Sequence, residues 1–192
     1  MAKTLFSLTE QIRKCTSCSL WKTRTLAVPG EGPSQAKIMF VGEAPGAEED
    51  RQGLPFVGRS GKFLDEMLIL AGIGRKDVFI TGAVKCHPPR NRTPAAGEVE
   101  TCRELWLKEQ IKIIKPELIV VLGKIALKSL LGGGKISEAS EAKMNGLHGK
   151  IVEKDGQKYF ITFHPSAGMR FPKIKRKMIA DFRRLKEAKK SK

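Results

Sequence analysis

Four cysteines constrain this 192-residue chain more than any other feature of its sequence. Cys15 and Cys18 form a Cys-x2-Cys pair near the N-terminus, whereas Cys86 and Cys102 lie near the middle of the chain. The sequence contains no other cysteine, so a single four-thiolate centre would use them all. Four thiolates suit either an iron–sulfur cluster or structural zinc. Either centre would tie the N-terminal segment to the middle of the chain.

Composition places the chain among soluble globular proteins. Hydrophobic residues make up 41% of it, and no apolar run approaches the roughly 18 residues of a membrane span. The first residues lack the long apolar stretch of a secretory signal. We therefore expect a single domain over residues 1–192, a cytoplasmic location and no membrane association. Cysteines in that compartment are more often metal ligands or catalytic groups than disulfides.

The charge of the chain favours a polyanionic partner. Its formal net charge is +16 and its isoelectric point is near 9.9. A lysine-rich solvated surface would explain part of this charge, but an imbalance of this size more often marks a nucleic-acid-binding protein. A membrane surface is less favoured, because no lipid-anchor signal follows a basic amphipathic stretch. Asparagine occurs only twice while Lys, Arg and Glu abound, which is typical of a heat-loving source.

Apolar runs and helical periodicities alternate along the chain. We predict strands at 37–41, 78–81 and 118–122, and a hairpin of strands at 151–153 and 158–163. We predict helices at 5–14, 60–71, 93–114 and 124–131, an irregular connection over 132–149, and a basic C-terminal helix over 173–192. This alternation predicts a three-layer α/β/α sandwich with a central, mainly parallel sheet.

Three sequence motifs begin where predicted strands end. Gly42 follows the first strand, Gly82 the second and His164 the last. Because parallel sheets bind ligands outside the carboxyl ends of their strands, these residues should share one site. A phosphate-binding loop is not indicated, since Gly61-Lys62-Phe63 lacks both the upstream glycine and the Ser or Thr that the pattern requires.

Three segments together carry a specific resemblance. They are Gly42-Glu43-Ala44-Pro45-Gly46, the stretch Lys85-Cys86-x-Pro88-Pro89-x-Asn91-Arg92, and His164-Pro165-Ser166. With the cysteine spacing, they resemble family 4 uracil-DNA glycosylases over roughly residues 10 to 185. The resemblance implies a uracil-DNA glycosylase-like fold. It also implies a monofunctional enzyme that hydrolyses the N-glycosidic bond of uracil, or of a related deaminated base, and leaves an abasic site in DNA.

The resemblance also implies roles for individual residues. Glu43 would position the attacking water, and His164 would donate a hydrogen bond to the departing base. Phe56 would stack on the flipped base. Taken alone, His164 could instead cap a helix and Phe56 could simply pack in the core. Four small residues are implied as base contacts: Gly42, Ala44, Gly46 and Gly82.

The implied cofactor is a [4Fe-4S] cluster held by Cys15, Cys18, Cys86 and Cys102, with structural zinc as the alternative. The implied partner is DNA that contains uracil or another damaged base; we expect a monomer, and the basic tail could serve DNA or a replication clamp. Met169 and Arg170 could enter the base stack. The full set of predicted DNA contacts is Lys85, Arg90, Arg92, Ser166, Met169 and Arg170.

One residue departs from the family pattern. The second strand in that pattern usually ends Thr-Asn, whereas Thr81 is followed here by Gly82. Loss of the amide predicts a roomier and less selective pocket, unless Asn91 or Gln52 supplies an amide from a neighbouring loop. The departure also leaves open a second function, namely a metal-stapled nucleic-acid-binding protein with lost or altered base specificity.

Overall fold

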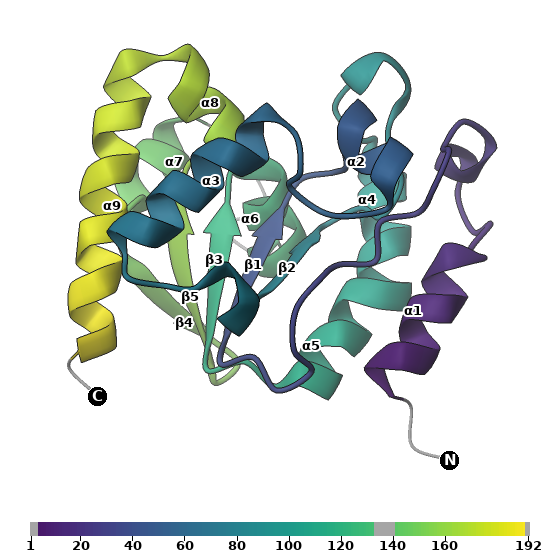
Figure 1. Cartoon of the computed structure of the whole chain (residues 1–192), viewed down its shortest axis with the longest axis horizontal. Coiled ribbons are helices and arrows are strands. Elements are labelled where there is room, and N and C mark those ends of the chain that lie inside the picture. The colour runs from purple at the N-terminus through teal and green to yellow at the C-terminus, as the bar shows by residue number, and fades with distance from the viewer. Residues whose placement is uncertain (1–3, 133–140, 191–192) are drawn as a thin grey trace.

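The computed structural model describes residues 4–132 and 141–190, which are arranged around one central sheet (Figure 1). Its strand order is β2-β1-β3-β5-β4, and β4 alone runs antiparallel to its neighbour. The mainly parallel sheet that the sequence predicts is therefore confirmed. The five strands of the described residues are β1 (Ile38–Gly42), β2 (Phe79–Gly82), β3 (Leu118–Leu122), β4 (Ile151–Lys154) and β5 (Gln157–Thr162).

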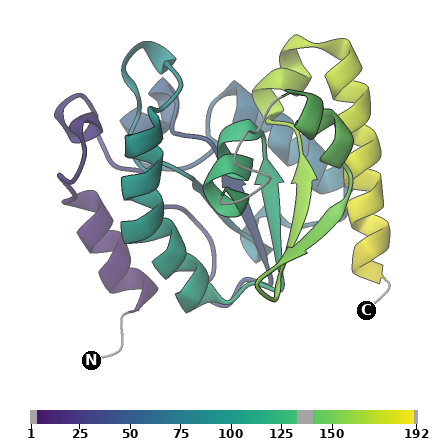
Figure 2. The same ribbon diagram turned by 180° about the vertical axis from the view of Figure 1, so that it is seen from behind.

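Helices cover both faces of the sheet, which confirms the predicted α/β/α sandwich. α3, α8 and α9 pack against one another on one face, whereas α6 lies on the other face with α4 and α5 beside it (Figures 1 and 2). No helix of the described residues combines the length and the apolar character needed to cross a bilayer. The helices are α1 (Leu5–Arg13), α2 (Ala47–Gln52), α3 (Arg59–Leu70), α4 (Ala96–Cys102), α5 (Lys108–Ile114), α6 (Lys124–Leu131), α7 (Glu141–Leu147), α8 (Pro165–Arg170) and α9 (Pro172–Lys190).

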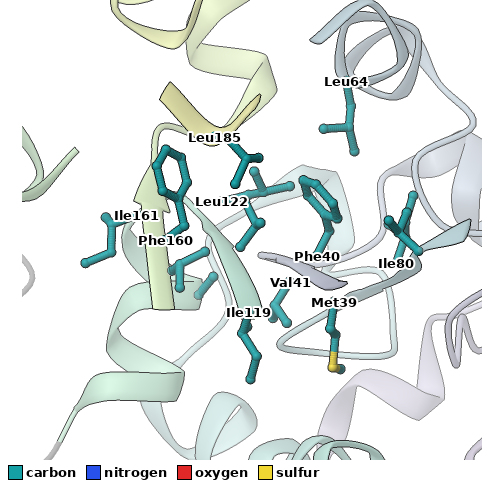
Figure 3. Close-up of a cluster of buried hydrophobic side chains, with 14 of the residues drawn as sticks. Met39, Phe40, Val41, Leu64, Ile80, Ile119, Leu122, Phe160, Ile161 and Leu185 are labelled. Atoms are coloured by element: carbon teal, nitrogen blue, oxygen red, sulfur yellow. The ribbon is translucent and has the colours of Figure 1, made fainter. Parts of the chain in front are cut away.

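The apolar strand residues form the core between these layers (Figure 3). Successive side chains of a strand point to opposite faces, so both faces of a doubly covered sheet must be apolar. Phe40 of β1 stacks on Phe182 of α9 with ring centroids 6.4 Å apart. Leu64 of α3 and Leu185 of α9 join the same core. These contacts fix α3 and α9 on the sheet and leave the basic side of α9 facing solvent.

Three details differ from the sequence-based expectation. The predicted helix 93–114 begins at Ala96, because the Glu98 carboxylate accepts a hydrogen bond from the Ala95 N–H and starts the helix there. A π-helical segment, Arg103–Leu107, interrupts it. Part of the predicted irregular connection over 132–149 is the helix α7. Residues 133–140 of that connection lie outside the described residues, as do residues 191–192 of the predicted C-terminal helix.

The parallel strands place one edge of the sheet beneath the predicted motifs. The arrowheads of β1 and β3 point toward the end of the molecule that carries α2 and α8, while α1 starts and α9 finishes at the opposite end (Figure 1). α1 packs against α5, with Leu8 and Ile12 buried. This packing holds the Cys15–Cys18 segment beside the middle of the chain.

Candidate active site and cysteine centre

A cavity of about 290 Å³ opens at the carboxyl edge of the sheet. It brings together residues from β1, β2 and the segment after β5, as the strand-end pattern predicts. The predicted site residues that line it are Glu43, Ala44, Gly46, Phe56, Gly82, Arg92, His164, Ser166 and Arg170. Four others do not line it: Gly42, Lys85, Arg90 and Met169.

Phe56 forms one wall of the cavity in a strained backbone conformation. Its φ angle is +51°, a region that few non-glycine residues adopt. Two glycines permit this placement. A Cβ atom at Gly42 would lie 2.5 Å from the Phe56 Cζ atom, and one at Gly61 would collide with the Phe56 carbonyl oxygen. Gly42 therefore lacks the side chain that would displace the Phe56 ring.

His164 faces the Phe56 ring across the cavity, with ring centroids 5.8 Å apart. It caps α8, and its Nδ1 atom accepts a hydrogen bond from the Ser166 N–H at 3.2 Å. In a neutral imidazole the proton must then sit on Nε2, which points toward Gly42. Burial lowers the pKa of His164 to about 4, although the Glu49 charge acts in the opposite direction. The side chain is therefore a neutral donor at physiological pH.

Gly123 brings the end of β3 close to this histidine. Its φ angle is +91°, and a Cβ atom there would lie 2.8 Å from the Cβ atom of His164. Its N–H donates to the Thr162 carbonyl at 2.9 Å. The glycine that ends the third predicted strand thus fixes the segment that carries His164.

Glu43 of the first motif and Glu49 of α2 have different surroundings. Glu43 faces the cavity, and burial raises the pKa of its carboxyl, opposed by the charge of Lys124. Glu49 is 8% exposed and accepts hydrogen bonds from the backbone N–H groups of Gly46, Val57 and Gly58 at 2.8–3.1 Å.

Glu49 therefore joins the first motif to the loop that carries Phe56. The sequence alone predicted no role for Glu49. Its position three residues after Gly46, at the start of α2, is the capping pattern that could have identified it.

Gly82 lies on the cavity with little space around its Cα. A Cβ atom there would be 2.8 Å from the Val84 carbonyl oxygen and 3.4 Å from that of Glu43. Of the two amides suggested as substitutes, Gln52 hydrogen-bonds Glu48 on an exposed surface and does not line the cavity. Asn91 does line it, with its Oδ1 atom 2.9 Å from His87 Nε2.

The predicted DNA contacts separate into three groups. The prediction for Lys85 is wrong, because its side chain is only 1% exposed and its ammonium is bonded inside the protein. Arg92 lines the cavity but donates two hydrogen bonds, at 2.7 and 2.8 Å, to Glu98. The other four predicted contacts have exposed side chains near the cavity or on its rim: Arg90, Ser166, Met169 and Arg170.

The Arg92–Glu98 pair supports the segment between the second motif and α4. The hydrogen bond from Arg92 lowers the pKa of Glu98 to about 2, so this carboxylate is ionised. The same carboxylate accepts from the Ser19 hydroxyl at 3.0 Å. The pair therefore connects the cavity rim to the residue that follows Cys18.

The four cysteines line one small pocket beneath the surface, as the sequence predicts for a shared centre. None of the four forms a disulfide; Cys86 and Cys102 are buried, and Cys15 and Cys18 are half-buried. Two donors point at their sulfurs: an Arg24 N–H at 3.1 Å from Cys86 and the Trp106 indole N–H at 3.3 Å from Cys15.

Burial raises the pKa of the Cys102 thiol to about 12. Within the described ranges, no set of three or more His, Cys, Asp or Glu side chains is arranged as the ligands of a single metal ion. A four-iron cluster does not require such an arrangement, because each of its cysteines binds a different iron. Four sulfurs converge on one pocket, and two N–H donors point at them.

Comparison with known proteins gives a consistent assignment. The model of the "Uracil DNA glycosylase superfamily" matches residues 29–185. A type-4 uracil-DNA glycosylase from Saccharolobus solfataricus is 42% identical over 96% of this chain and 86% of its own length. One from Pyrobaculum aerophilum is 45% identical over 89% of this chain and 87% of its own. A type-5 uracil-DNA glycosylase from the same organism is 35% identical. The chain therefore belongs to the uracil-DNA glycosylase superfamily, among its type-4 members.

Proposed function

We propose that this protein is a monofunctional uracil-DNA glycosylase of base-excision repair. It hydrolyses the N-glycosidic bond of uracil, or of a related deaminated base, and leaves an abasic site. The observation that carries this proposal is the meeting of Glu43, Phe56 and His164 around one cavity at the carboxyl edge of the sheet. A binding-only protein is less well supported, because it would need neither a carboxylate nor a neutral imidazole on the cavity lining.

The base must leave the DNA stack before any side chain in this cavity can reach it. A flipped pyrimidine would stack on the Phe56 ring. The Nε2–H of His164 would then donate to the base oxygen that gains negative charge as the glycosidic bond breaks. A neutral imidazole suits this role, because the cap from the Ser166 N–H fixes which nitrogen carries the proton.

Glu43 would act on the sugar side of the bond. As a carboxylate it can orient a water toward the anomeric carbon and stabilise positive charge on the sugar, as carboxylates do in glycoside hydrolysis. No lysine lines the described cavity, so hydrolysis by water is favoured over a lysine–sugar adduct. The products are the free base and an abasic site.

A uracil-release assay tests the proposal. A labelled oligonucleotide with one uracil, opposite guanine, opposite adenine or unpaired, is incubated with the protein and then treated with alkali. We expect strand breaks at the uracil and none in the matched oligonucleotide with thymine. Tight binding of the uracil strand without breaks would contradict the enzyme proposal and favour the binding-only alternative.

The rate of the reaction should not fall as the pH rises through neutrality. Because the pKa of His164 is about 4, its neutral form predominates above pH 5. The carboxyl of Glu43 has a raised pKa and must be ionised, so the single-turnover rate should fall as the pH drops through that value. We therefore expect no decline in rate as the pH rises from about 6 to 8. A rate that declines as the pH rises through about 6.5 would indicate a histidine acting as an imidazolium acid instead.

Asn91 is the amide best placed to compensate for Gly82. We expect Asn91→Ala to lower the preference for uracil over cytosine, measured as the ratio of kcat/KM values, and Gln52→Ala to leave it unchanged. The complementary change Gly82→Asn is expected to destabilise the protein, because its Cβ atom would press on the Val84 carbonyl oxygen. A stable Gly82→Asn variant with sharper uracil preference would restore the roomier-pocket hypothesis.

We propose that Cys15, Cys18, Cys86 and Cys102 hold a [4Fe-4S] cluster rather than zinc. The residues fit this group, because four sulfurs line one pocket and two N–H donors point at them. When bound, the cluster supplies a cross-link between the N-terminal segment and the core. The purified protein should absorb at about 400 nm and contain iron and acid-labile sulfide. Stoichiometric zinc in a colourless protein would contradict the proposal.

A further inference from the structure

Lys85 is a buried cation that the proposed reaction does not use. Its side chain is 1% exposed, although lysine is rarely buried without a charged partner. The ammonium donates to Thr81 Oγ1 at 2.6 Å, to Gln110 Oε1 at 2.6 Å and to the Gly82 carbonyl at 2.8 Å. These three oxygens satisfy its hydrogen bonds, but all of them are neutral. Its positive charge therefore requires a counter-charge from elsewhere.

The neutral network around Lys85 is rigid. The Thr81 hydroxyl and the Gln110 amide both donate to the Pro29 carbonyl at 2.8 Å. The Val28 N–H donates to the Lys85 carbonyl at 2.7 Å. The ammonium is thus held where β2, α5 and the 28–29 segment meet, and it has little freedom to move toward solvent.

Negative charge is available on the side of the cysteines. Lys85 lines the same pocket as the four thiols and precedes Cys86 in the chain. A four-thiolate iron–sulfur centre carries net negative charge, so it would supply the missing counter-charge.

We infer that Lys85 is a positioning residue that couples the cysteine centre to the base cavity, because this buried cation lines the cysteine pocket and its ammonium donates a hydrogen bond to the Gly82 carbonyl. The inference rests on the proposed cluster. Gly82 lies on the cavity lining, so the ammonium is the link between the two sites. Loss of the centre leaves a buried cation without a counter-charge, which is strongly unfavourable, and the Gly82 segment then has to rearrange.

Two variants separate the charge from the hydrogen bond. Lys85→Gln removes the charge but keeps a donor, and Lys85→Met removes both. Lys22→Met is the matched control, because Lys22 is an exposed lysine in the Ser19–Lys22 turn that follows Cys18. Iron and sulfide content, the midpoint potential of the bound centre, and kcat and KM for a uracil oligonucleotide are measured for each.

Both Lys85 variants should show a lower midpoint potential than the wild type and Lys22→Met, since a nearby cation stabilises the more negative, reduced centre. Lys85→Met should also raise KM, because Gly82 loses its donor. An unchanged potential in Lys85 variants with a full complement of iron would overturn the inference. Wild-type protein without iron and sulfide would overturn the inference about Lys85 in a different way, because the proposed cluster itself would then be absent.

A measurement on the wild type covers the case in which neither variant folds. Chelation of the centre should reduce affinity for uracil-containing DNA more than affinity for the same DNA without uracil, in protein whose circular dichroism is retained. An equal loss on both DNAs would overturn the coupling, because it would show an effect on general DNA binding alone.

Discussion

Replacing His164 with alanine is expected to lower the single-turnover rate of uracil release by about 10²–10³-fold. The side chain lies on the cavity lining beside Phe56, and the Ser166 cap on Nδ1 leaves the proton on Nε2. Its low pKa keeps it neutral, so it contributes a fixed donor rather than a mobile charge. Alanine removes that donor, and water entering the space would have to reorganise as the anion forms.

The measurement is the rate of base release at saturating enzyme on an oligonucleotide with one uracil. Ser166→Ala removes the hydroxyl that lies 2.8 Å from His164 Nδ1 but keeps the backbone N–H that caps this atom, so we expect a much smaller effect. His164→Gln retains an N–H donor and should recover part of the rate. A loss of less than about tenfold in His164→Ala would mean that the imidazole does not stabilise the leaving base.

The sheet and the position of the site could be predicted because they depend on local patterns. Short apolar runs define buried strands, and a motif that begins where such a run ends lies at the edge of a parallel sheet. Gly42, Gly82 and His164 meet there for that reason. The shared pocket of the four cysteines was predictable from their number, since only one four-thiolate centre could use them all.

Burial and long-range hydrogen bonds were not predictable in the same way. A lysine in a chain of charge +16 is expected at the surface, but the Lys85 ammonium donates to Gln110 on α5, and the Gln110 amide donates to the Pro29 carbonyl. The start of the helix at Ala96 depends on the Glu98 carboxylate. The π-helical segment that follows leads to Trp106, whose indole reaches Cys15. These features depend on tertiary contacts, so a local pattern cannot specify them.

The crowding at Gly82 shows the same limit at the level of a single residue. From the sequence, the missing side chain at position 82 predicts an enlarged pocket. In the structure, the backbone of Glu43 and Val84 approaches Gly82 so closely that part of this space is filled. Selectivity therefore depends on how the neighbouring loops pack as well as on the residue at position 82, and Asn91 is the amide that this packing places on the cavity.

Glu43→Gln is expected to reduce the rate of uracil release by about 10²–10⁴-fold, the range observed when a positioned acid or base is removed. Glutamine keeps the shape of the side chain but cannot stabilise positive charge on the sugar or accept a proton from water. Because burial raises the pKa of the Glu43 carboxyl, its ionisation should set the acid limb of the pH profile. That limb should disappear from the residual activity of the variant.

Glu48→Gln provides the control for this change. Glu48 is an exposed carboxylate on the neighbouring helix α2, paired with Arg51 at 2.7 Å, so the same charge is removed a few residues away. We expect its rate and pH profile to match the wild type, and KM to stay similar in both variants because neither loses a base contact. If Glu43→Gln retained the acid limb, a different group would control the reaction and Glu43 would act only in packing. If both variants lost rate equally, the effect would come from the net charge of this region, and the assignment of Glu43 to the sugar side of the bond would be wrong.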